Sequence, residues 1–263
     1  MKDEVYQERV DLTGEGCLVL NYHRVRNPNT LVKMFDKITS IYQKDAELIY
    51  YSVYQDEFQE QLSYLLDEEF QFITANDLEN MLFEKQPIPE KCAMVTFDDV
   101  DISVYKNAYP FLVEHKIPFA LFIITGNVGE SDFNGLKLAS WEQIFEMTKS
   151  GLATVGVHTH HMHYLEKRKN PPFLSKTNLK TFKRDTELSI KTMKEKFNQP
   201  STHFAYPYGF GIAETDEILK DLGYKMIYTL EPGIVQKNDS SYKIKRVLIT
   251  RGNWKDIRKW VEK

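Results

Sequence analysis

The stretch Ala93-Met94-Val95-Thr96-Phe97-Asp98-Asp99 decides how this chain folds. The residues before its two carboxylates are mostly apolar and strand-prone, as in a parallel strand that is buried on both faces. The carboxyl end of such a strand is where α/β folds place their chemistry. Because successive strand side chains point to opposite sides, Asp98 and Asp99 can differ in role, one holding a metal ion and the other free as a base. The alternative is that Asp99 caps the next helix and Asp98 is an ordinary loop acid.

Apolar runs of this kind recur along the chain, and helical patterns lie between them. We expect strands at 17–22, 70–73, 93–99, 119–124, 154–157, 203–206, 225–230 and 244–249. We expect helices at 55–69, 103–115, 141–150, 179–197, 214–222 and 254–260, and a short one that Asn76 caps. Strands that alternate with helices over short connections specify a parallel sheet, which about seven or eight strands could close into a barrel. The sequence therefore predicts the α/β class.

The composition limits the number of domains and the kind of partner. The chain has 263 residues, of which 42% are hydrophobic, and it shows neither an internal repeat nor a linker. We therefore predict a single domain over 1–263, with a loose N-terminal arm at 1–16. The net charge of −4 argues against a nucleic-acid partner and a polyanionic substrate, while it permits a neutral or cationic polymer.

The segment 24–54 allows several interpretations. An apolar stripe within it has no clean cap, so a core helix, a flap over a site and a surface-docking loop are all open. The stripe consists of Leu31, Val32, Met34, Phe35, Ile38, Ile41 and Tyr42. If these side chains are exposed, they would allow peripheral contact with a membrane or cell surface.

The cysteines and the start of the chain bear on its compartment. Cys17 and Cys92 form no CxxC motif, so we expect two small buried residues, with a mutual disulfide left open. The first residues do not resemble a signal peptide, and no run of eighteen apolar residues predicts a membrane span. The protein is therefore either cytoplasmic or a secreted form whose signal peptide is absent from this sequence.

Three predicted strand ends carry side chains suited to chemistry: His23, the Asp98–Asp99 pair and the stretch 158–163. In a parallel barrel, such ends converge on one mouth. The stretch holds four of the chain's seven histidines, and two imidazoles five residues apart on a turn can face one point. One added carboxylate gives a His₂Asp set with open positions, which suits Zn²⁺ or a similar divalent ion, whereas the alternative is a solvated polar loop. Of His160 and His161, we expect one to orient a metal ligand and the other to be exposed.

The motifs of this chain resemble those of a known family. Residues 96–99 (TFDD) match the first motif of the polysaccharide deacetylases of carbohydrate esterase family 4, the NodB-homology domain. Residues 158–163 (HTHHMH) resemble its histidine motif in the longer-spaced form. Residues 21–24 (NYHR) look like a subgroup whose acid histidine precedes the aspartate motif, which contains the poly-β-1,6-N-acetylglucosamine deacetylases of bacterial biofilms. The resemblance covers nearly the whole chain and implies a single distorted (β/α) barrel of about seven strands.

The resemblance also implies a role for each motif residue. Three side chains would bind the metal, namely Asp99, His158 and His163. Asp98 would be the general base and His23 the general acid. Tyr208, within residues 206–209 (YPYG), would offer its backbone N–H to the oxyanion.

The chain departs from the family pattern at three places. The arginine that usually steadies the base is missing, since residues 204–205 (FA) occupy that stretch, and Arg246 is a candidate replacement. The C-terminal Leu-x-His motif is replaced by residues 248–250 (LIT), which agrees with an acid supplied by His23. His161 stands where an acidic residue is expected, which leaves the tuning of the acid histidine open.

Together these residues suit the hydrolysis of an acetamide. A metal activates water and polarises the carbonyl, a carboxylate takes the proton, and a backbone N–H holds the oxyanion. An amine leaves poorly unless it is protonated, so an acid must act with the base. The resemblance thus predicts a monomeric, secreted or cell-surface enzyme that deacetylates an extracellular amino-sugar polymer, poly-β-1,6-N-acetylglucosamine. A peptidoglycan or chitin deacetylase and a non-catalytic carbohydrate-binding module are the alternatives.

Overall fold

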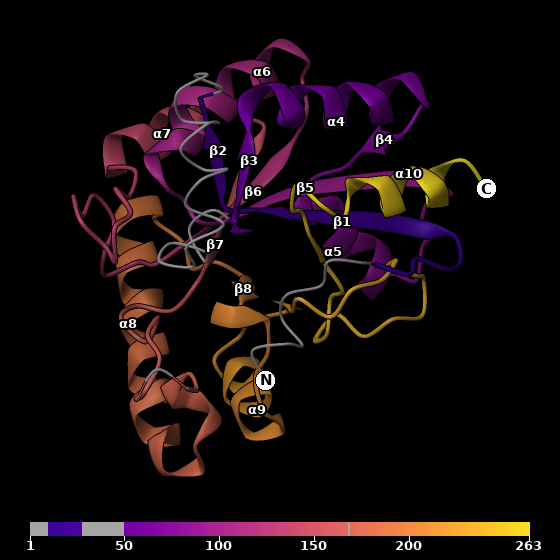
Figure 1. Ribbon diagram of the computed structural model, residues 1–263. Coiled ribbons are helices and arrows are strands. Elements are labelled where there is room, and N and C mark those ends of the chain that lie inside the picture. The colour runs from indigo at the N-terminus through magenta and orange to yellow at the C-terminus, as the bar shows by residue number, and fades with distance from the viewer. Residues whose placement is uncertain (1–9, 28–49, 168) are drawn as a thin grey trace.

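A curled parallel sheet forms the centre of the protein. The computed structural model describes residues 10–27, 50–167 and 169–263, and Figure 1 shows how their elements are arranged. The sheet has the strand order β10-β1-β5-β6-β7-β8-β9, with β4 paired to the start of β5, and every pair is parallel. The strands are β1 (Gly16–Tyr22), β4 (Gln71–Phe72), β5 (Lys91–Asp99), β6 (Phe119–Ile123), β7 (Ala153–Val157), β8 (His203–Ala205), β9 (Met226–Tyr228) and β10 (Val247–Leu248).

The two edges of this sheet are joined by the segment 244–249. The Ile244 N–H donates to the Ile227 carbonyl of β9 at 2.9 Å, and the Ile244 carbonyl accepts the Thr229 N–H at the same distance. At the other end of the segment, the Ile249 N–H donates to the Asn21 carbonyl of β1 at 2.9 Å. The sheet therefore curls into the distorted (β/α) barrel that the sequence predicts.

Helices pack against the curled sheet, most of them on its outside. They are α4 (Gln55–Asp67), α5 (Ala75–Phe83), a π-helical turn (Val104–Ala108) that continues into α6 (Tyr109–Glu114), α7 (Trp141–Lys149), α8 (Leu179–Phe197), α9 (Ala213–Asp221) and α10 (Trp254–Val261), with 3₁₀ turns at Pro172–Leu174, Lys176–Asn178 and Pro207–Gly209. Figure 1 shows α4, α6, α7, α8 and α9 following one another around the sheet. The predicted helices are present, but Asn76 does not cap α5. Thr74 does, because its Oγ1 accepts the Asp77 N–H at 3.0 Å.

Alternation along the strands divides the apolar core into two layers. On β5, Val95 packs in the larger cluster beneath the outer helices. Met94 packs in a second cluster on the barrel interior, which Leu78 of α5 helps to fill. Thr96 and Asp98 continue the interior-facing set of β5, so the first of the two carboxylates points into the barrel.

The structure adds two strands to the sequence prediction. β2 (Arg24–Arg26) pairs in parallel with β3 (Ser52–Tyr54), and both belong to the segment 24–54. The apolar stripe at 31–42, on which the flap and membrane hypotheses depend, lies outside the described residues, as do residues 1–9 of the predicted arm. Across the described ranges, no helix combines the length and apolar character needed to cross a bilayer.

The two cysteines are neighbours across the central strand pair. Cys17 of β1 is the register partner of Cys92 of β5, and both side chains are completely buried. Both thiols are free. The prediction of small buried residues is confirmed, and the disulfide alternative is not formed.

Candidate active site

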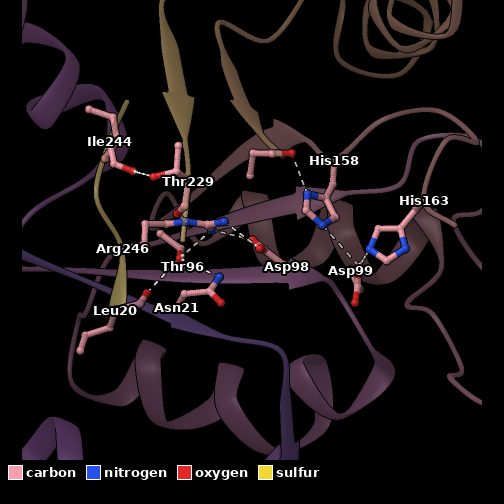
Figure 2. Close-up of polar contacts among 11 residues, drawn as sticks. Leu20, Asn21, Thr96, Asp98, Asp99, His158, His163, Thr229, Ile244 and Arg246 are labelled. Atoms are coloured by element: carbon pink, nitrogen blue, oxygen red, sulfur yellow. Dashed lines mark hydrogen bonds and ion pairs between the residues drawn. The ribbon is translucent and has the colours of Figure 1, made fainter. Parts of the chain in front are cut away.

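Asp99 lies beside two imidazoles at the carboxyl end of the sheet. Its Oδ1 is 3.6 Å from Nε2 of His158 and 3.1 Å from Nε2 of His163. Asp99 ends β5, and the two histidines stand on the segment that leaves β7 (Figure 2). One ligand atom from each residue lies within 4.8 Å of the other two. The structure therefore brings together the three side chains that we expected to share a metal ion.

A backbone carbonyl fixes the ring of His158. Its Nδ1 lies 2.8 Å from the carbonyl oxygen of Ala205, which can only accept, so Nδ1 carries the proton. Burial lowers the pKa of His158 to about 4, although the Asp98 charge opposes this shift. The neutral ring then turns the lone pair of Nε2 toward the Asp99 oxygen. Two electron-rich atoms held in this way repel each other unless a cation joins them.

These donors fit a divalent metal ion. Two imidazole nitrogens and one carboxylate oxygen form a set that leaves coordination positions open for water and substrate. A hydrogen bond from the second ring nitrogen to a backbone carbonyl, as His158 makes, is typical of metal-binding histidines. The repulsion between Asp99 and neutral His158 leads to the same conclusion from electrostatics.

His163 is held differently from His158. Within the described residues, its buried Nδ1 has no hydrogen-bond partner. The centroid of its ring lies 5.7 Å from that of Phe133 and 5.0 Å from that of Tyr208. Burial lowers the pKa of His163, but the adjacent Asp99 carboxylate outweighs burial and raises that pKa above its ordinary value. Protons therefore compete with a metal for this nitrogen.

Asp98 is paired with a buried arginine. Both of its oxygens accept hydrogen bonds from Arg246, from Nη1 to Oδ1 at 2.7 Å and from Nη2 to Oδ2 at 2.8 Å (Figure 2). Burial raises the pKa of Asp98, but the guanidinium and other nearby charges outweigh burial and hold that pKa below its usual value. The carboxylate is therefore ionised at neutral pH. This contact is the one expected of an arginine that steadies a catalytic base.

Arg246 is itself held from several sides. Its side chain is completely buried, and its Nε donates to the carbonyl oxygen of Thr229 at 2.9 Å. The guanidinium carbon lies 5.3 Å from the ring centre of Phe122 and 5.9 Å from that of Tyr228. A planar donor fork held in this way sets the direction of the Asp98 carboxylate as well as its charge.

The backbone turns sharply at the two carboxylates. Asp99 and Val100 both have a φ of 61°, and the Val100 N–H donates to the Asp98 carbonyl at 2.6 Å. A β-branched residue rarely adopts this left-handed conformation, which costs about 1–3 kcal/mol. Because of this turn, Asp99 points to the mouth of the barrel while Asp98 faces the interior. Asp99 does not cap the next helix, because the Ser103 N–H at its start donates to Oδ1 of Asp101 at 2.9 Å.

A cavity of about 430 Å³ opens beside this cluster. Asp99 and His163 line it, whereas Asp98 and His158 lie beneath its surface, each 1% exposed. Its other lining residues are His23, Arg24, Tyr51, Phe133, Asn134, Leu136, Tyr164, Leu165, Tyr208 and Leu230. Aromatic and apolar walls with a few polar groups are typical of a ligand site.

His23 and Tyr208 reach this cavity from different strands. His23 follows β1, and its ring centroid lies 4.7 Å from that of Tyr51. Burial lowers the pKa of His23, although the Asp98 and Asp99 charges oppose the shift. Tyr208 stands in the 3₁₀ turn after β8 with a φ of 62°. Both residues lie near the cluster of Asp99, His158 and His163, while their roles as acid and oxyanion donor stay predictions.

His160 and His161 lie against the loop that follows β6. Nδ1 of His160 is 2.9 Å from Oγ1 of Thr125, and Nδ1 of the exposed His161 is 3.0 Å from Oδ1 of Asn127. Their backbone N–H groups donate to Asp185 of α8. The rings thus contact this loop and not the three proposed ligands. A role for His161 in tuning the site stays a prediction.

The sequence analysis missed three contributors to the site. Ala205 acts through its carbonyl oxygen, and Asp185 approaches from a distant helix, so neither has a local sequence signal. Phe133 does have one, because Asn134-Gly135 forms the two-residue turn of a hairpin in which both turn residues have positive φ. An Asn-Gly pair is the strongest short-range signal for such a hairpin and would have identified this loop.

Three kinds of comparison with known proteins find similarity to polysaccharide deacetylases. The model of the family described as polysaccharide deacetylase matches residues 85–227. A Staphylococcus aureus (strain MRSA252) protein named poly-beta-1,6-N-acetyl-D-glucosamine N-deacetylase is 35% identical over 261 residues, covering 98% of this chain and 87% of the relative. A Staphylococcus epidermidis protein of the same name is 30% identical, covering 93% of this chain and 83% of that protein. The solved structure of IcaB from Ammonifex degensii aligns with a TM-score of 0.84 and 36% identity, covering 96% of this chain and 100% of the other.

Proposed function

The chain belongs to the polysaccharide deacetylase family, and on this premise we propose that it removes acetyl groups from poly-β-1,6-N-acetylglucosamine by metal-dependent hydrolysis. The observation that carries the proposal is the convergence of Asp99, His158 and His163 beside Asp98, a carboxylate that is bound to arginine and stands apart from these ligands. The choice of polymer rests on the named relatives, which match almost the whole chain.

Asp98 is the proposed general base. A divalent ion bound to Asp99, His158 and His163 would supply a Lewis acid that activates water and polarises the amide carbonyl. Asp98 takes the proton of the attacking water, and Arg246 keeps the carboxylate ionised and directed. Because its pKa lies below the usual value, the base is available throughout the neutral range.

His23 is the proposed general acid. It lines the same cavity as Asp99 and follows β1, the strand paired with β5. The leaving amine needs a proton before the C–N bond breaks. Burial disfavours the protonated form of His23 and lowers its pKa, whereas the Asp98 and Asp99 charges favour that form. The backbone N–H of Tyr208 is the proposed donor to the oxyanion.

The cavity suits a sugar ring next to the scissile amide. Phe133 and Leu136 line it from a short hairpin in which their backbones exchange hydrogen bonds of 2.7 and 2.9 Å. Tyr51 and Tyr164 add aromatic surface with hydroxyl groups. The net charge of −4 is compatible with a polymer that is neutral before deacetylation and cationic afterwards.

The finer parts of the proposal concern the metal, the location and the assembly. We assign Zn²⁺, because it favours two histidines and a carboxylate with an open position. A polymer outside the cell calls for a secreted or surface-held enzyme. One chain supplies all of the proposed catalytic and metal-binding side chains, so we propose a monomer. Peripheral contact with a membrane through residues 31–42 stays a prediction.

Acetate release tests this function directly. The protein is incubated with poly-β-1,6-N-acetylglucosamine oligomers, chitin oligomers or peptidoglycan fragments, before and after chelation and after re-addition of Zn²⁺. We expect the fastest release from the β-1,6-linked oligomers, its loss on chelation and its recovery with Zn²⁺. Faster release from chitin or peptidoglycan would reassign the substrate. No release from any polymer by the Zn²⁺-bound protein would favour a carbohydrate-binding module.

A further inference from the structure

A carboxylate from a distant helix holds the histidine stretch 158–163. Asp185 lies in the middle of α8 and is 6% exposed. Its Oδ2 accepts the backbone N–H of His160 at 2.7 Å, and its Oδ1 accepts that of His161 at 2.8 Å. Each oxygen thus has its own donor. Both donors belong to the backbone between the two histidines assigned to the metal.

The stretch needs this acceptor because its backbone conformation is unfavourable. Thr159 has a φ of 69°, a left-handed conformation that is strained and rare for a β-branched residue. The following two N–H groups point to the same side, as in the backbone concavities that bind anions. The Asp185 carboxylate fills this concavity. It therefore stabilises a conformation that the stretch would not prefer by itself.

The loop after β6 holds the stretch through its carbonyl groups. The Thr125 N–H donates to the Thr159 carbonyl at 3.0 Å. The Gly126 N–H donates to the His160 carbonyl at 3.0 Å. A Cβ at Gly126 would lie 2.7 Å from that carbonyl oxygen, so the two segments are in close contact. The stretch is thus held by the loop through its carbonyls and by α8 through its N–H groups.

Of the two histidines, His163 depends more on the stretch. The ring of His158 is fixed by the carbonyl of Ala205. In the described part of the chain, Nδ1 of His163 has no such partner, so its ring takes its position from the backbone and from neighbouring rings. A shift of the backbone at 160–161 would therefore move Nε2 of His163 away from Asp99, which is 3.1 Å distant.

We propose that Asp185 is a positioning residue, which sets the metal affinity of the site by holding the stretch 158–163 so that His163 faces Asp99. The inference rests on the proposed metal-dependent function. Asp185 is buried on α8 and acts through the backbone, because its carboxylate accepts from two backbone N–H groups of the stretch. Replacing residues that orient metal ligands typically weakens metal binding about 10–100-fold.

The test compares Asp185→Asn with Asp216→Asn. In the first variant, an NH₂ group replaces one acceptor and faces a backbone N–H. Asp216 is a matched control, because it is a half-buried aspartate of α9 that accepts a hydrogen bond from the Tyr206 hydroxyl at 2.8 Å. Zn²⁺ is titrated into each metal-free protein against a chromophoric chelator, and thermal unfolding is measured in parallel. We expect the Kd for Zn²⁺ to rise at least about tenfold in Asp185→Asn and to stay within about twofold in Asp216→Asn.

Kinetics separate a positioning role from a catalytic one. At saturating Zn²⁺, we expect Asp185→Asn to regain most of the wild-type kcat with an unchanged KM, because Asp185 touches no reacting group. Asp185→Glu keeps the charge and both acceptors, so its Kd should fall between those of the wild type and Asp185→Asn. This variant carries the test if Asp185→Asn does not fold.

Two results would overturn the inference. One is a wild-type Kd for Zn²⁺ in the Asp185 variants. The other is an equal rise of Kd in Asp216→Asn, which would trace the effect to general destabilisation. Failure of the wild-type protein to bind Zn²⁺ would instead contradict the proposed function, so the two failures can be told apart.

Discussion

The two ends of β8 serve two different histidine–carboxylate clusters. At its start, His203 uses both ring nitrogens, Nδ1 with the hydroxyl of Tyr228 and Nε2 with Oδ1 of Asn76, each at 3.1 Å. The neighbouring Glu79 accepts hydrogen bonds of 2.8 Å from Thr202 and from a lysine. Every polar atom of this cluster's histidine and glutamate therefore has a partner from the chain itself.

At the other end of β8, the same residue types are left incomplete. Ala205 binds only one nitrogen of His158, and Nε2 of both His158 and His163 converges on one oxygen of Asp99. Asp99 and His163 also line an open cavity. A buried polar network in which every group has a hydrogen-bond partner stabilises a fold. Buried nitrogen and oxygen atoms that converge without enough hydrogen-bond partners indicate a site for a ligand. Hydrogen-bond satisfaction thus separates these clusters where composition does not.

Arg246→Met should have the largest combined effect on stability and activity, because it removes the partner of Asp98, which lies beside the incomplete cluster. It leaves Asp98 as a buried charge without a partner, which typically costs about 3–5 kcal/mol of stability. Asp98 would then take up a proton, so the base is lost and acetate release should fall more than about 100-fold. Urea unfolding and an acetate assay measure the two effects. Arg246→Lys, which keeps the charge without the fork, should be intermediate, and full activity in Arg246→Met would contradict the role of this pair.

His23→Ala should change activity without changing the metal site. Loss of the general acid should lower kcat about 10²–10⁴-fold. Zn²⁺ affinity and thermal stability should stay at the wild-type level, because His23 is not among the proposed ligands. The exposed His115, which ends α6, provides a control in His115→Ala with wild-type kcat. A loss of Zn²⁺ in His23→Ala would show instead that His23 belongs to the ligand set.

His203→Gln should sharpen the comparison from the other end of β8. It removes a partner from buried polar groups, so we expect a loss of about 1–3 kcal/mol in the free energy of unfolding. The activity of the folded fraction should be unchanged, because His203 lies at the start of β8 among partnered groups. Urea unfolding and acetate release decide this. A stable variant with little activity would place His203 in the catalytic machinery.

A pH effect on stability should be smaller, and His203 should contribute to it together with His158, whose pKa burial also lowers to about 4. Burial lowers the pKa of His203 to about 4, although Glu79 opposes the shift, so the unfolded chain binds more protons than the folded one below the ordinary pKa. Stability is then complete above that ordinary value and falls as the pH drops from about 6.5 toward 4. The part of the loss between pH 7 and pH 5 that His203 causes should be on the order of 2 kcal/mol. Urea unfolding at both pH values checks this, and an equal pH dependence in His203→Gln would assign the effect to other groups.

Much of the fold follows from patterns that burial imposes on a sequence. The run before Asp98 is apolar because β5 is covered on both faces, so the strand was readily predicted. β2 and β3 were missed, because each has only three residues and β2 contains two arginines. The sequence analysis placed the cap of α5 at Asn76, whereas Thr74 is the cap. Both residue types cap helices, and only the backbone conformation, which is extended at Thr74, decides between them.

The site was predictable where one local motif carries the chemistry. The aspartate pair and the histidine stretch each stand at one strand end, so topology alone brings Asp99, His158 and His163 together. Arg246 was only a candidate, because its contact with Asp98 spans 148 residues of sequence. The Ala205 carbonyl and Asp185 had no signal, because a backbone acceptor has no residue type and a helical aspartate is common on surfaces.

The measurement that tests the account most directly compares Asp98→Asn with Asp99→Asn in bound Zn²⁺ and acetate release. The account predicts that Asp98→Asn keeps stoichiometric Zn²⁺ and loses activity by about 10³-fold, because the base is gone while the ligands remain. It predicts that Asp99→Asn loses both Zn²⁺ affinity and activity. Wild-type Zn²⁺ affinity in Asp99→Asn, or wild-type activity in Asp98→Asn, would contradict it.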